Sequence, residues 1–364
     1  MLKGKTILIL SPQPWDDRHV SKHNYAKELA KIAQIYFLNP VQYKFLKGGF
    51  EVRQVQNNLH VVNMTLPIPK SFKFHLSFVY DIILEKYFNK LESYIPGKIN
   101  VYWEFDKEIN CRAYELFPGA IKIFHPVDDF NPKEEIDYSI FDICFTVSQD
   151  VLYKIPHPYK HLINHGLSDA FTKNALLNRK KGKIEANKQL IATYMGNLSI
   201  PFLDVISLEL IIKAHPDIKF NFIGNYDEET AFIHFLKSQH NVELLGLKVD
   251  EELANCLNQS DVLLLCYKGG EGYNMDNSHK VLEYLSTGHV IVSSRLSFYE
   301  HIKLFPMAHQ FENEDYPTLF EEVIQNIEKY NSIENRQKRI DFALNNTYQK
   351  HLQKIEGHID DTVL

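Results

Sequence analysis

The sequence contains few cysteines, no long apolar run and no excess of positive charge, and each shortage excludes a class of protein. Its cysteines are Cys111, Cys144, Cys256 and Cys266. They form no C-x-x-C pair and lie in apolar segments, which indicates buried free thiols in a reducing compartment rather than a disulfide framework. The apolar stretch 6–10 is too short for a secretory signal, and no run approaches the roughly 18 residues that span a bilayer. We therefore expect a cytoplasmic protein, with peripheral contact at the inner membrane face as its closest association with a bilayer.

The net charge and the length of the chain narrow the class of protein further. A formal net charge of -6 disfavours nucleic acid as the main partner, because such a protein must neutralise phosphates. Hydrophobic residues make up 45% and charged residues 24%, which is typical of a folded globular protein rather than a disordered one. At 364 residues the chain exceeds the size that one core usually organises, so two domains are expected.

Short apolar runs rich in Ile, Val and Phe alternate with amphipathic stretches, which predicts parallel strands separated by helices and hence an α/β fold. The strands predicted in the first half are 6–11, 35–39, 100–105, 121–126 and 141–148. Those of the second half are 190–195, 218–223, 242–245, 261–267 and 289–293, with helices at 202–214, 228–240, 250–259 and 278–287. Alternating apolar residues from 51 to 64, around Asn57-Asn58, predict a hairpin inserted in the first half.

The segment 174–188 interrupts this alternation, since it holds five basic residues and few apolar ones. It indicates a solvated linker between domains, or else a charged surface loop. We predict an N-terminal domain over 1–173 and a C-terminal domain over 187–335. The C-terminal helices of 336–364 are expected to pack back on the first domain.

One strand-to-helix connection has the features of an anion site. Three glycines within 269–272 let the backbone approach a ligand closely, and the helix predicted to begin at Ser278 offers the positive end of its dipole. His279, Lys280 and Glu283 are spaced so that they share one face of that helix. Lys280 suits phosphate oxygens and Glu283 suits ribose hydroxyls, and the alternative is a surface ion pair between the two.

The segment 277–293, N-S-H-K-V-L-E-Y-L-S-T-G-H-V-I-V-S, resembles the N-S-x-K-x-x-E-Y-L-A-x-G-x-P-V-V-S motif of sugar-nucleotide glycosyltransferases with the GT-B fold. The second half is similar to that family also at 194–198 (Y-M-G-N-L) and at 261–264 (D-V-L-L). The resemblance implies two doubly wound Rossmann-like domains with a central cleft. The N-terminal domain would bind the acceptor and the C-terminal domain the donor nucleotide.

In the first half, 124–130 (F-H-P-V-D-D-F) resembles the Y-x-x-V-D-D-[WF] element of enzymes that build bacterial cell-surface polysaccharides. Asp128 and Asp129 follow a predicted strand, where a carboxylate can act as the general base for an acceptor hydroxyl. Helix capping or a turn is the alternative role. We favour Asp128, because adjacent side chains at a strand end point in opposite directions and one of the two is expected to face the cleft.

The resemblance also implies a donor site. Its nucleotide-binding residues would be Gly196, Asn197, Tyr273, Ser278, His279, Lys280 and Glu283, and its sugar-binding residues Glu271 and Asn274. No metal and no cofactor besides the sugar-nucleotide substrate are expected, because enzymes of this fold generally work without a bound metal. His157, His161 and His165 are spaced by four but interrupted by prolines, so they would not share a helix face.

Two departures from the family pattern bear on the mechanism. Met275 stands where the E-x7-E pattern of many retaining members has a glutamate, and 197–204 carries no basic residue. Donor phosphates would then be neutralised by Lys280 and backbone amides, and both retention and inversion of configuration stay open.

The resemblance implies a hexosyltransferase that moves a sugar from a nucleoside-diphosphate sugar, with UDP as the expected nucleotide, to a hydroxyl of a saccharide or lipid-linked acceptor. The expected role is bacterial surface polysaccharide synthesis. A nucleotide-sugar 2-epimerase, an inactive sugar-nucleotide-binding protein and a two-lobed solute-binding protein are the alternatives. The segment 70–90, which interleaves aromatic residues with lysines, is interpreted as a helical crossover that covers the sheet, and contact with a membrane-borne acceptor is the alternative.

Overall fold

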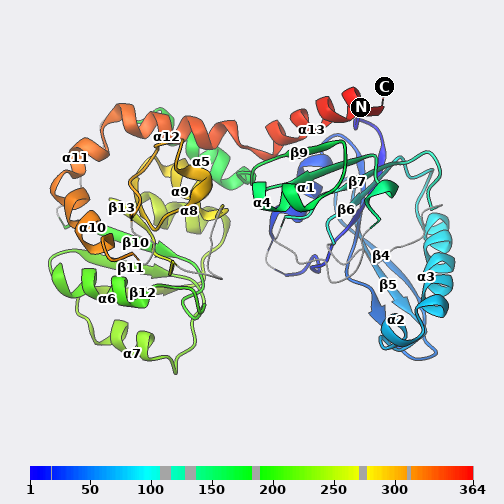
Figure 1. The fold of residues 1–364 in the computed structure, drawn as a ribbon, viewed down its shortest axis with the longest axis horizontal. Helices are drawn as coiled ribbons and strands as arrows, with labels where there is room; N and C mark the ends of the chain where they lie inside the picture. The colour runs from blue at the N-terminus through cyan, green and yellow to red at the C-terminus, as the bar shows by residue number, and fades with distance from the viewer. Residues whose placement is uncertain are drawn as a thin grey trace. The chain divides into compact units, whose positions relative to one another are not determined.

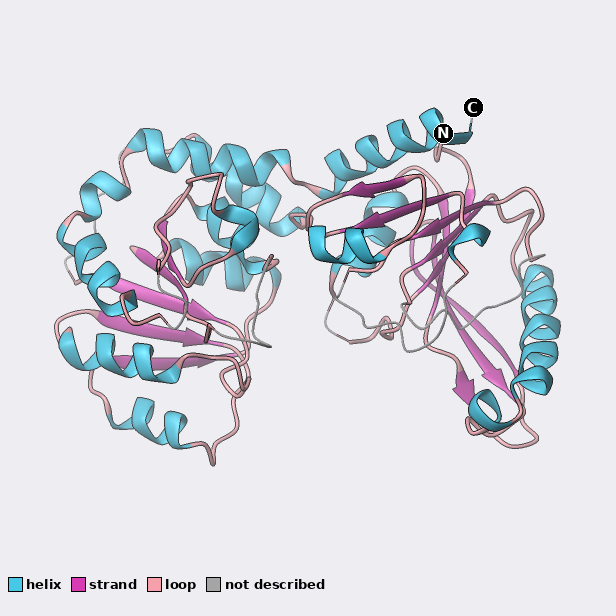
Figure 2. Cartoon of the chain, in the orientation of Figure 1, coloured by secondary structure: helices cyan, strands magenta, loops and turns pink. Residues whose placement is uncertain are grey.

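The computed structural model describes residues 1–17, 19–106, 116–127, 137–182, 189–269, 277–309 and 313–363. They form two compact units, each built around its own sheet with helices packed on it (Figures 1 and 2). Unit 1 comprises Met1–Asn164 and Tyr348–Leu364, and unit 2 comprises His165–Thr347. Within the described ranges, no helix is both long and apolar enough to cross a membrane.

The described part of unit 1 contains a nine-stranded sheet with the order β3-β5-β2-β1-β6-β7-β8-β9, in which β4 pairs with β5. Its strands are β1 (Thr6–Leu10), β2 (Gln34–Leu38), β3 (Gln42–Tyr43), β4 (Gly49–Gln56), β5 (Leu59–Leu66), β6 (Val101–Glu104), β7 (Ile121–Phe124), β8 (Ile143–Thr146) and β9 (Lys160–Leu162). Its helices are α1 (Ser21–Leu29), α2 (Phe72–His75), α3 (Ser77–Leu91), α4 (Gln149–Lys154) and α13 (Tyr348–Val363), with 3-10 turns η1 (Glu92–Tyr94) and η2 (Tyr138–Ile140). Apart from β4, which pairs antiparallel with β5, the paired strands are parallel.

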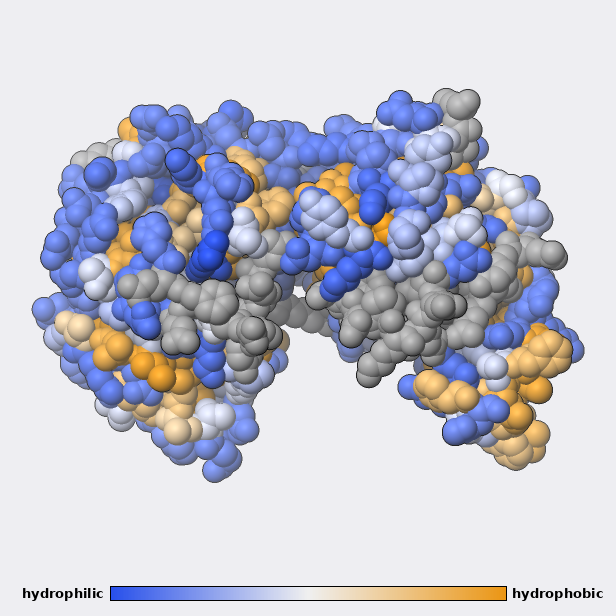
Figure 3. Space-filling model, viewed as in Figure 1, coloured by the Kyte–Doolittle hydropathy of each residue, from blue (hydrophilic) through white to orange (hydrophobic). Residues whose placement is uncertain are grey.

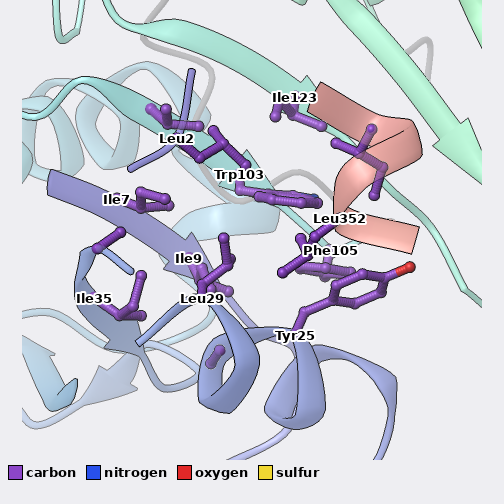
Figure 4. Close-up of a cluster of buried hydrophobic side chains, with 14 of the residues drawn as sticks. Leu2, Ile7, Ile9, Tyr25, Leu29, Ile35, Trp103, Phe105, Ile123 and Leu352 are labelled. Carbon is purple, nitrogen blue, oxygen red and sulfur yellow. The ribbon is translucent and has the colours of Figure 1, made fainter. Parts of the chain in front are cut away.

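The central strands β1, β2, β6 and β8 are buried on both faces, which explains their largely apolar sequences. Along β1, Ile7 and Ile9 enter one core and Leu8 and Leu10 enter the other. The first core includes Tyr25 of α1 and Leu352 of α13, which Figure 4 shows together with Trp103 of β6. The second includes buried residues of α3.

The hairpin predicted around Asn57-Asn58 is confirmed, since β4 and β5 pair in the antiparallel sense on either side of it. Asn58 has φ of 60°, a left-handed conformation that asparagine tolerates better than most residues. β5 also pairs in parallel with β2, so the hairpin is an extension of the main sheet rather than a separate insertion.

Unit 2 contains five parallel strands in the order β12-β11-β10-β13-β14 among its described residues. They are β10 (Ile191–Met195), β11 (Lys219–Ile223), β12 (Val242–Gly246), β13 (Val262–Leu265) and β14 (Val290–Ser293). The helices are α5 (Asp169–Arg179), α6 (Val205–Ala214), α7 (Ala231–Ser238), α8 (Asp250–Asn258), α9 (Lys280–Thr287), α10 (Tyr316–Gln325), α11 (Ile327–Tyr330) and α12 (Ile333–Asn345), with the 3-10 turn η3 (Ser297–Tyr299). The strands and helices predicted for this half are confirmed, with ends that shift by a few residues.

The limits of the two units differ from the domain limits expected from the sequence. The N-terminal unit ends at Asn164 rather than at 173, and 174–179 belongs to α5 rather than to a solvated linker. α5 is anchored because Phe171 and Ala175, four residues apart, enter the core of unit 2. Residues 183–188 lie outside the described part of the chain.

Of the C-terminal helices expected to return to the first domain, α13 does so and α12 stays in unit 2. The Tyr348 ring packs edge-on against Tyr25 of α1, with 4.8 Å between centroids. Glu356 accepts hydrogen bonds from the N-terminal ammonium group (3.0 Å) and from the backbone N–H of Leu2 (2.7 Å). The chain thus returns to unit 1 through both apolar and ionic contacts.

Candidate functional site

The carboxyl edge of the second sheet is shaped by glycines that end three neighbouring strands: Gly196, Gly224 and Gly246 follow or close β10, β11 and β12. Gly196 has φ of 152° and Gly224 has φ of 144°. A Cβ atom on Gly224 would lie 1.9 Å from the carbonyl oxygen of Gly196, so the two backbones meet where a side chain would not fit. The edge therefore presents bare backbone, the kind of surface that a phosphate can approach closely.

The strand order places the topological switch point of this sheet between β10 and β13. From β10 the chain proceeds to β11 and β12 on one side, and then to β13 and β14 on the other. Ligands of open parallel sheets bind outside the carboxyl ends of the strands at such a point. Helix α9 follows β13 and brings Lys280 to the same place, because a Cβ atom on Gly196 would lie 2.2 Å from the Lys280 Nζ atom.

Lys280 is a buried cation, with 8% of its surface exposed. Its Nζ atom donates to the hydroxyl of Tyr267 at 2.9 Å and lies 5.3 Å from the ring centroids of both Tyr194 and Tyr267. Among the described residues, these contacts of the ammonium group are with tyrosines and not with a carboxylate. The surface ion pair with Glu283, considered as an alternative, is therefore not what holds this side chain.

Tyr194, one of the two tyrosines around Lys280, does not neutralise it. Burial raises the pKa of Tyr194 well above its usual value, so this phenol stays uncharged at neutral pH. Burial does the same to Tyr284 of α9, whose hydroxyl accepts from the backbone N–H of Met195 (2.7 Å) and donates to the carbonyl of Leu264 (3.2 Å). Tyr284 thereby fixes α9 against β10 and β13.

The first turn of α9 holds the other predicted residues of this helix. Ser278 is buried, and its carbonyl accepts from the backbone N–H of Val281 at 3.1 Å. His279 is the exposed N-cap residue, and its ring lies 6.1 Å from that of His165. Glu283 is half-buried, one turn after His279. Lys280 is thus buried, whereas His279 and Glu283 are more exposed, and their expected sharing of one face stays a prediction.

The remaining predicted residues are distributed as follows. Asn197 is exposed, and its side-chain oxygen accepts from the backbone N–H of Ser199 at 2.9 Å. The expected catalytic residues Asp128 and Asp129, and the expected donor residues Glu271, Tyr273 and Asn274, lie outside the described residues. Their roles stay predictions.

Unit 1 has a carboxylate pair that sequence reasoning missed, at the carboxyl end of β6. Glu104 is fully buried and accepts from the hydroxyl of Tyr102 (2.5 Å) and the backbone N–H of Asp106 (2.9 Å). Burial first, and then the charge of Asp106, raises the pKa of Glu104 well above its usual value. A signal was present, because two acidic residues follow the apolar segment 101–103.

A cavity of ≈ 840 Å³ in unit 2 lies elsewhere, between the segment 303–309 and helices α10 to α12. It is lined by Arg339 and Tyr330, and its lining includes none of the predicted donor residues that the structure describes. The guanidinium group of Arg339 donates to the carbonyls of Gly288 (3.0 Å) and Tyr330, so its hydrogen bonds fasten α12 to the ends of α9 and α11. Within the ranges that the structure describes, no cluster of three or more histidine, cysteine or acidic side chains is placed to hold a metal ion.

The whole chain has the architecture of known two-domain enzymes. No protein-family model and no curated protein matches the sequence. Among solved structures, a UDP-forming α,α-trehalose-phosphate synthase from Burkholderia xenovorans is 10% identical, with a TM-score of 0.69 over 99% of this chain and 100% of that one. The E. coli trehalose-6-phosphate protein bound with UDP-2-fluoro glucose is 9% identical, with a TM-score of 0.66 over 97% of this chain and 99% of that one.

Anabaena HepE, solved in complex with UDP and glucose, is 11% identical, with a TM-score of 0.62 over 98% of this chain and 100% of that one. Together with the two Rossmann-like sheets, these matches show that the chain has the GT-B fold, as the motif at 277–293 led us to expect. At this level of identity the likeness extends to the fold alone.

Proposed function

We propose that the chain is a glycosyltransferase that moves a hexose from a nucleoside-diphosphate sugar, with UDP as the nucleotide, to a hydroxyl of a saccharide or lipid-linked acceptor. The observation that supports this most strongly is Lys280, a buried cation whose contacts are tyrosines, at the carboxyl edge of a sheet lined by Gly196 and Gly224. Burying a charge is unfavourable unless a partner compensates it. A diphosphate supplies that partner.

In this proposal Lys280 and the N-terminus of α9 bind the diphosphate of the donor. The first backbone N–H groups of a helix lack acceptors within the helix and point toward an anion placed there. As the bond between the sugar and the diphosphate breaks, negative charge develops on the leaving oxygen, and a fixed cation stabilises it. Glu283, one turn along α9, would accept hydrogen bonds from the ribose hydroxyls.

The acceptor hydroxyl would lose its proton to a carboxylate of the first unit, Asp128 or Asp129. Its oxygen forms the new bond to the anomeric carbon while the bond from that carbon to the diphosphate oxygen breaks. The products are the glycosylated acceptor and the nucleoside diphosphate. We propose UDP as the nucleotide because solved neighbours were determined with UDP or a UDP-sugar. We also propose a role in surface polysaccharide synthesis, which the V-D-D-F sequence at 127–130 supports.

A thermal-shift panel of UDP, GDP, TDP, ADP and CMP tests the donor site, because a ligand that binds the folded state raises the melting temperature. We expect one nucleotide, UDP, to raise it in the wild type and not in Lys280→Met or Glu283→Gln. The matched control is Lys237→Met, which removes an exposed lysine of α7 that pairs with Glu228. A panel without any shift, or equal shifts in Lys280→Met, would refute the assignment.

Turnover of the matching UDP-sugars then separates the enzymatic alternatives. Transfer, or slow hydrolysis with water as the acceptor, releases free UDP. A 2-epimerase instead leaves the nucleotide attached to a sugar of altered configuration. An inactive binding protein shows the thermal shift and yields neither product.

A further inference from the structure

One end of unit 1 exposes an unusual concentration of apolar side chains. We define this apolar end as Phe45, Leu46, Phe74, Leu76, Phe78 and Ile82. Phe45, Leu46 and Phe78 are the most exposed of them, at 69%, 79% and 77%. All three large exposed phenylalanines of the described chain belong to it. In Figure 3, hydrophobic surface gathers where α2 and the adjoining strand ends lie.

The two segments that supply these side chains are neighbours in the fold. The backbone N–H of Leu46 donates to the carbonyl of Pro67 at 3.1 Å, and Phe72 at the start of α2 donates to Pro69 at 3.1 Å. The hydroxyls of Tyr43 and Tyr80, which flank the two segments, lie 3.2 Å apart. The two segments that supply the apolar end therefore lie side by side in unit 1.

Folding of the unit does not account for these side chains. Helix α3 already buries Tyr80, Leu84, Phe88 and Leu91 in the core. Phe78 and Ile82 lie one turn apart on a different, exposed face of the same helix. Leu46 has φ of 59°, a conformation that leucine rarely adopts, and still presents its side chain to solvent. An apolar surface kept at such positions indicates a partner.

The charge around the apolar end is mainly positive, with Asp81 beside Ile82 and Glu85 one turn further along α3 as the acidic residues of the adjoining helix. Segments 42–48 and 68–78 contain Lys44, Lys47, Lys70 and Lys73 and no acidic residue, in a chain whose formal net charge is -6. Aromatic and aliphatic side chains flanked by lysines match an anionic bilayer: the apolar groups enter the boundary between headgroups and acyl chains, and the ammonium groups stay with the lipid phosphates. We propose that the apolar end docks unit 1 on an anionic lipid membrane.

This inference goes beyond sugar transfer and is tested without any sugar nucleotide. The full chain is sedimented with vesicles of phosphatidylcholine alone and with vesicles that contain about 30% phosphatidylglycerol. We expect binding to the anionic vesicles, weakened by added salt. The double variant Phe74→Ser/Phe78→Ser should lower the partition coefficient at least about tenfold, since two side chains no longer enter the bilayer.

Three further variants separate the contribution of charge to vesicle binding from that of the apolar side chains. Lys44→Ser/Lys47→Ser should lower binding to the anionic vesicles about tenfold, and Lys3→Ser/Lys5→Ser, a matched loss of two exposed charges, should leave it unchanged. Leu247→Ser/Val249→Ser, which removes two exposed apolar side chains of unit 2, is the apolar control and should bind as the wild type does. The urea midpoint of each variant is compared with that of the wild type to confirm folding.

Three results would overturn the proposal. The first is a wild-type chain that binds neither kind of vesicle. The second is equal binding by the wild type and by Phe74→Ser/Phe78→Ser. The third is a wild-type dimer that this variant converts to a monomer without any vesicle binding, because a second copy of the chain would then cover the apolar end.

Discussion

Replacing Lys280 by methionine separates a ligand-binding cation from a structural one. Met keeps most of the apolar length of the side chain and removes the charge. The change removes a hydrogen bond to Tyr267 and two cation–π contacts, with Tyr194 and Tyr267, but also removes the unfavourable burial of an ammonium group. These effects oppose one another, so we expect the free energy of unfolding to stay within about 1 kcal/mol of the wild type.

Nucleotide binding should respond very differently. A hydrogen bond to a charged group contributes about 2 kcal/mol, so the dissociation constant for UDP should rise roughly 30-fold in Lys280→Met. Urea unfolding measures the stability and isothermal titration calorimetry the affinity. A loss of more than about 3 kcal/mol of stability would contradict the reasoning, because breaking a buried ion pair has that effect and Lys280 would then belong to the fold.

Three other substitutions or conditions test the fold. Gly224→Ala should lower the free energy of unfolding, measured in urea, by about 3 kcal/mol. The new Cβ atom would lie 1.9 Å from the Gly196 carbonyl oxygen, and residue 224 has φ of 144°. A loss below about 1 kcal/mol would contradict that close approach. Gly357→Ala in α13 should instead raise it by about 0.5 to 1 kcal/mol, since nothing lies within 4 Å of the added Cβ atom and alanine favours the helix. Burial lowers the pKa of His23 to about 4, below the unfolded value near 6.5, so the unfolded state binds the proton first. The stabilisation is therefore complete above about pH 6.5 and falls by about 3 kcal/mol as the pH drops toward 4. Melting temperatures between pH 7 and pH 5 should show this loss, and His23→Gln should flatten the dependence.

The sequence predicted the central strands well because they are buried on both faces, whereas the short and partly exposed β3 and β9 were not predicted. In β1, every residue from Ile7 to Leu10 enters one core or the other, so the strand is a continuous apolar run that ends at a turn signal. The glycines after β10 and β11 were visible in the sequence as strand ends. Their close approach was not, because it depends on the pairing of two strands that lie 28 residues apart, from Gly196 to Gly224.

Tertiary contacts explain where the sequence interpretation was incomplete. The basic residues after Arg179 indicated a linker, whereas Phe171 and Ala175 hold the preceding turns of α5 in the core of unit 2. Asn178, also buried, donates to Asn258 at 2.8 Å. Local composition does not report such long-range partners.

The candidate site was predicted by motif, and its physical basis appears only in the structure. Spacing placed Lys280 and Glu283 on one helix, but it did not reveal that the ammonium group lies between two tyrosine rings. Tyr284, whose hydroxyl bonds to both β10 and β13, was part of the motif without an assigned role. The Glu104 and Asp106 pair was overlooked because no motif includes it.

A crystal structure of the chain with bound UDP tests the central claim most directly. The account predicts diphosphate oxygens about 3 Å from the Lys280 Nζ atom, over the backbone of Gly196 and before the first turn of α9. Nucleotide density in another place, such as the cavity beside Arg339, with Lys280 still in contact only with its tyrosines, would contradict it.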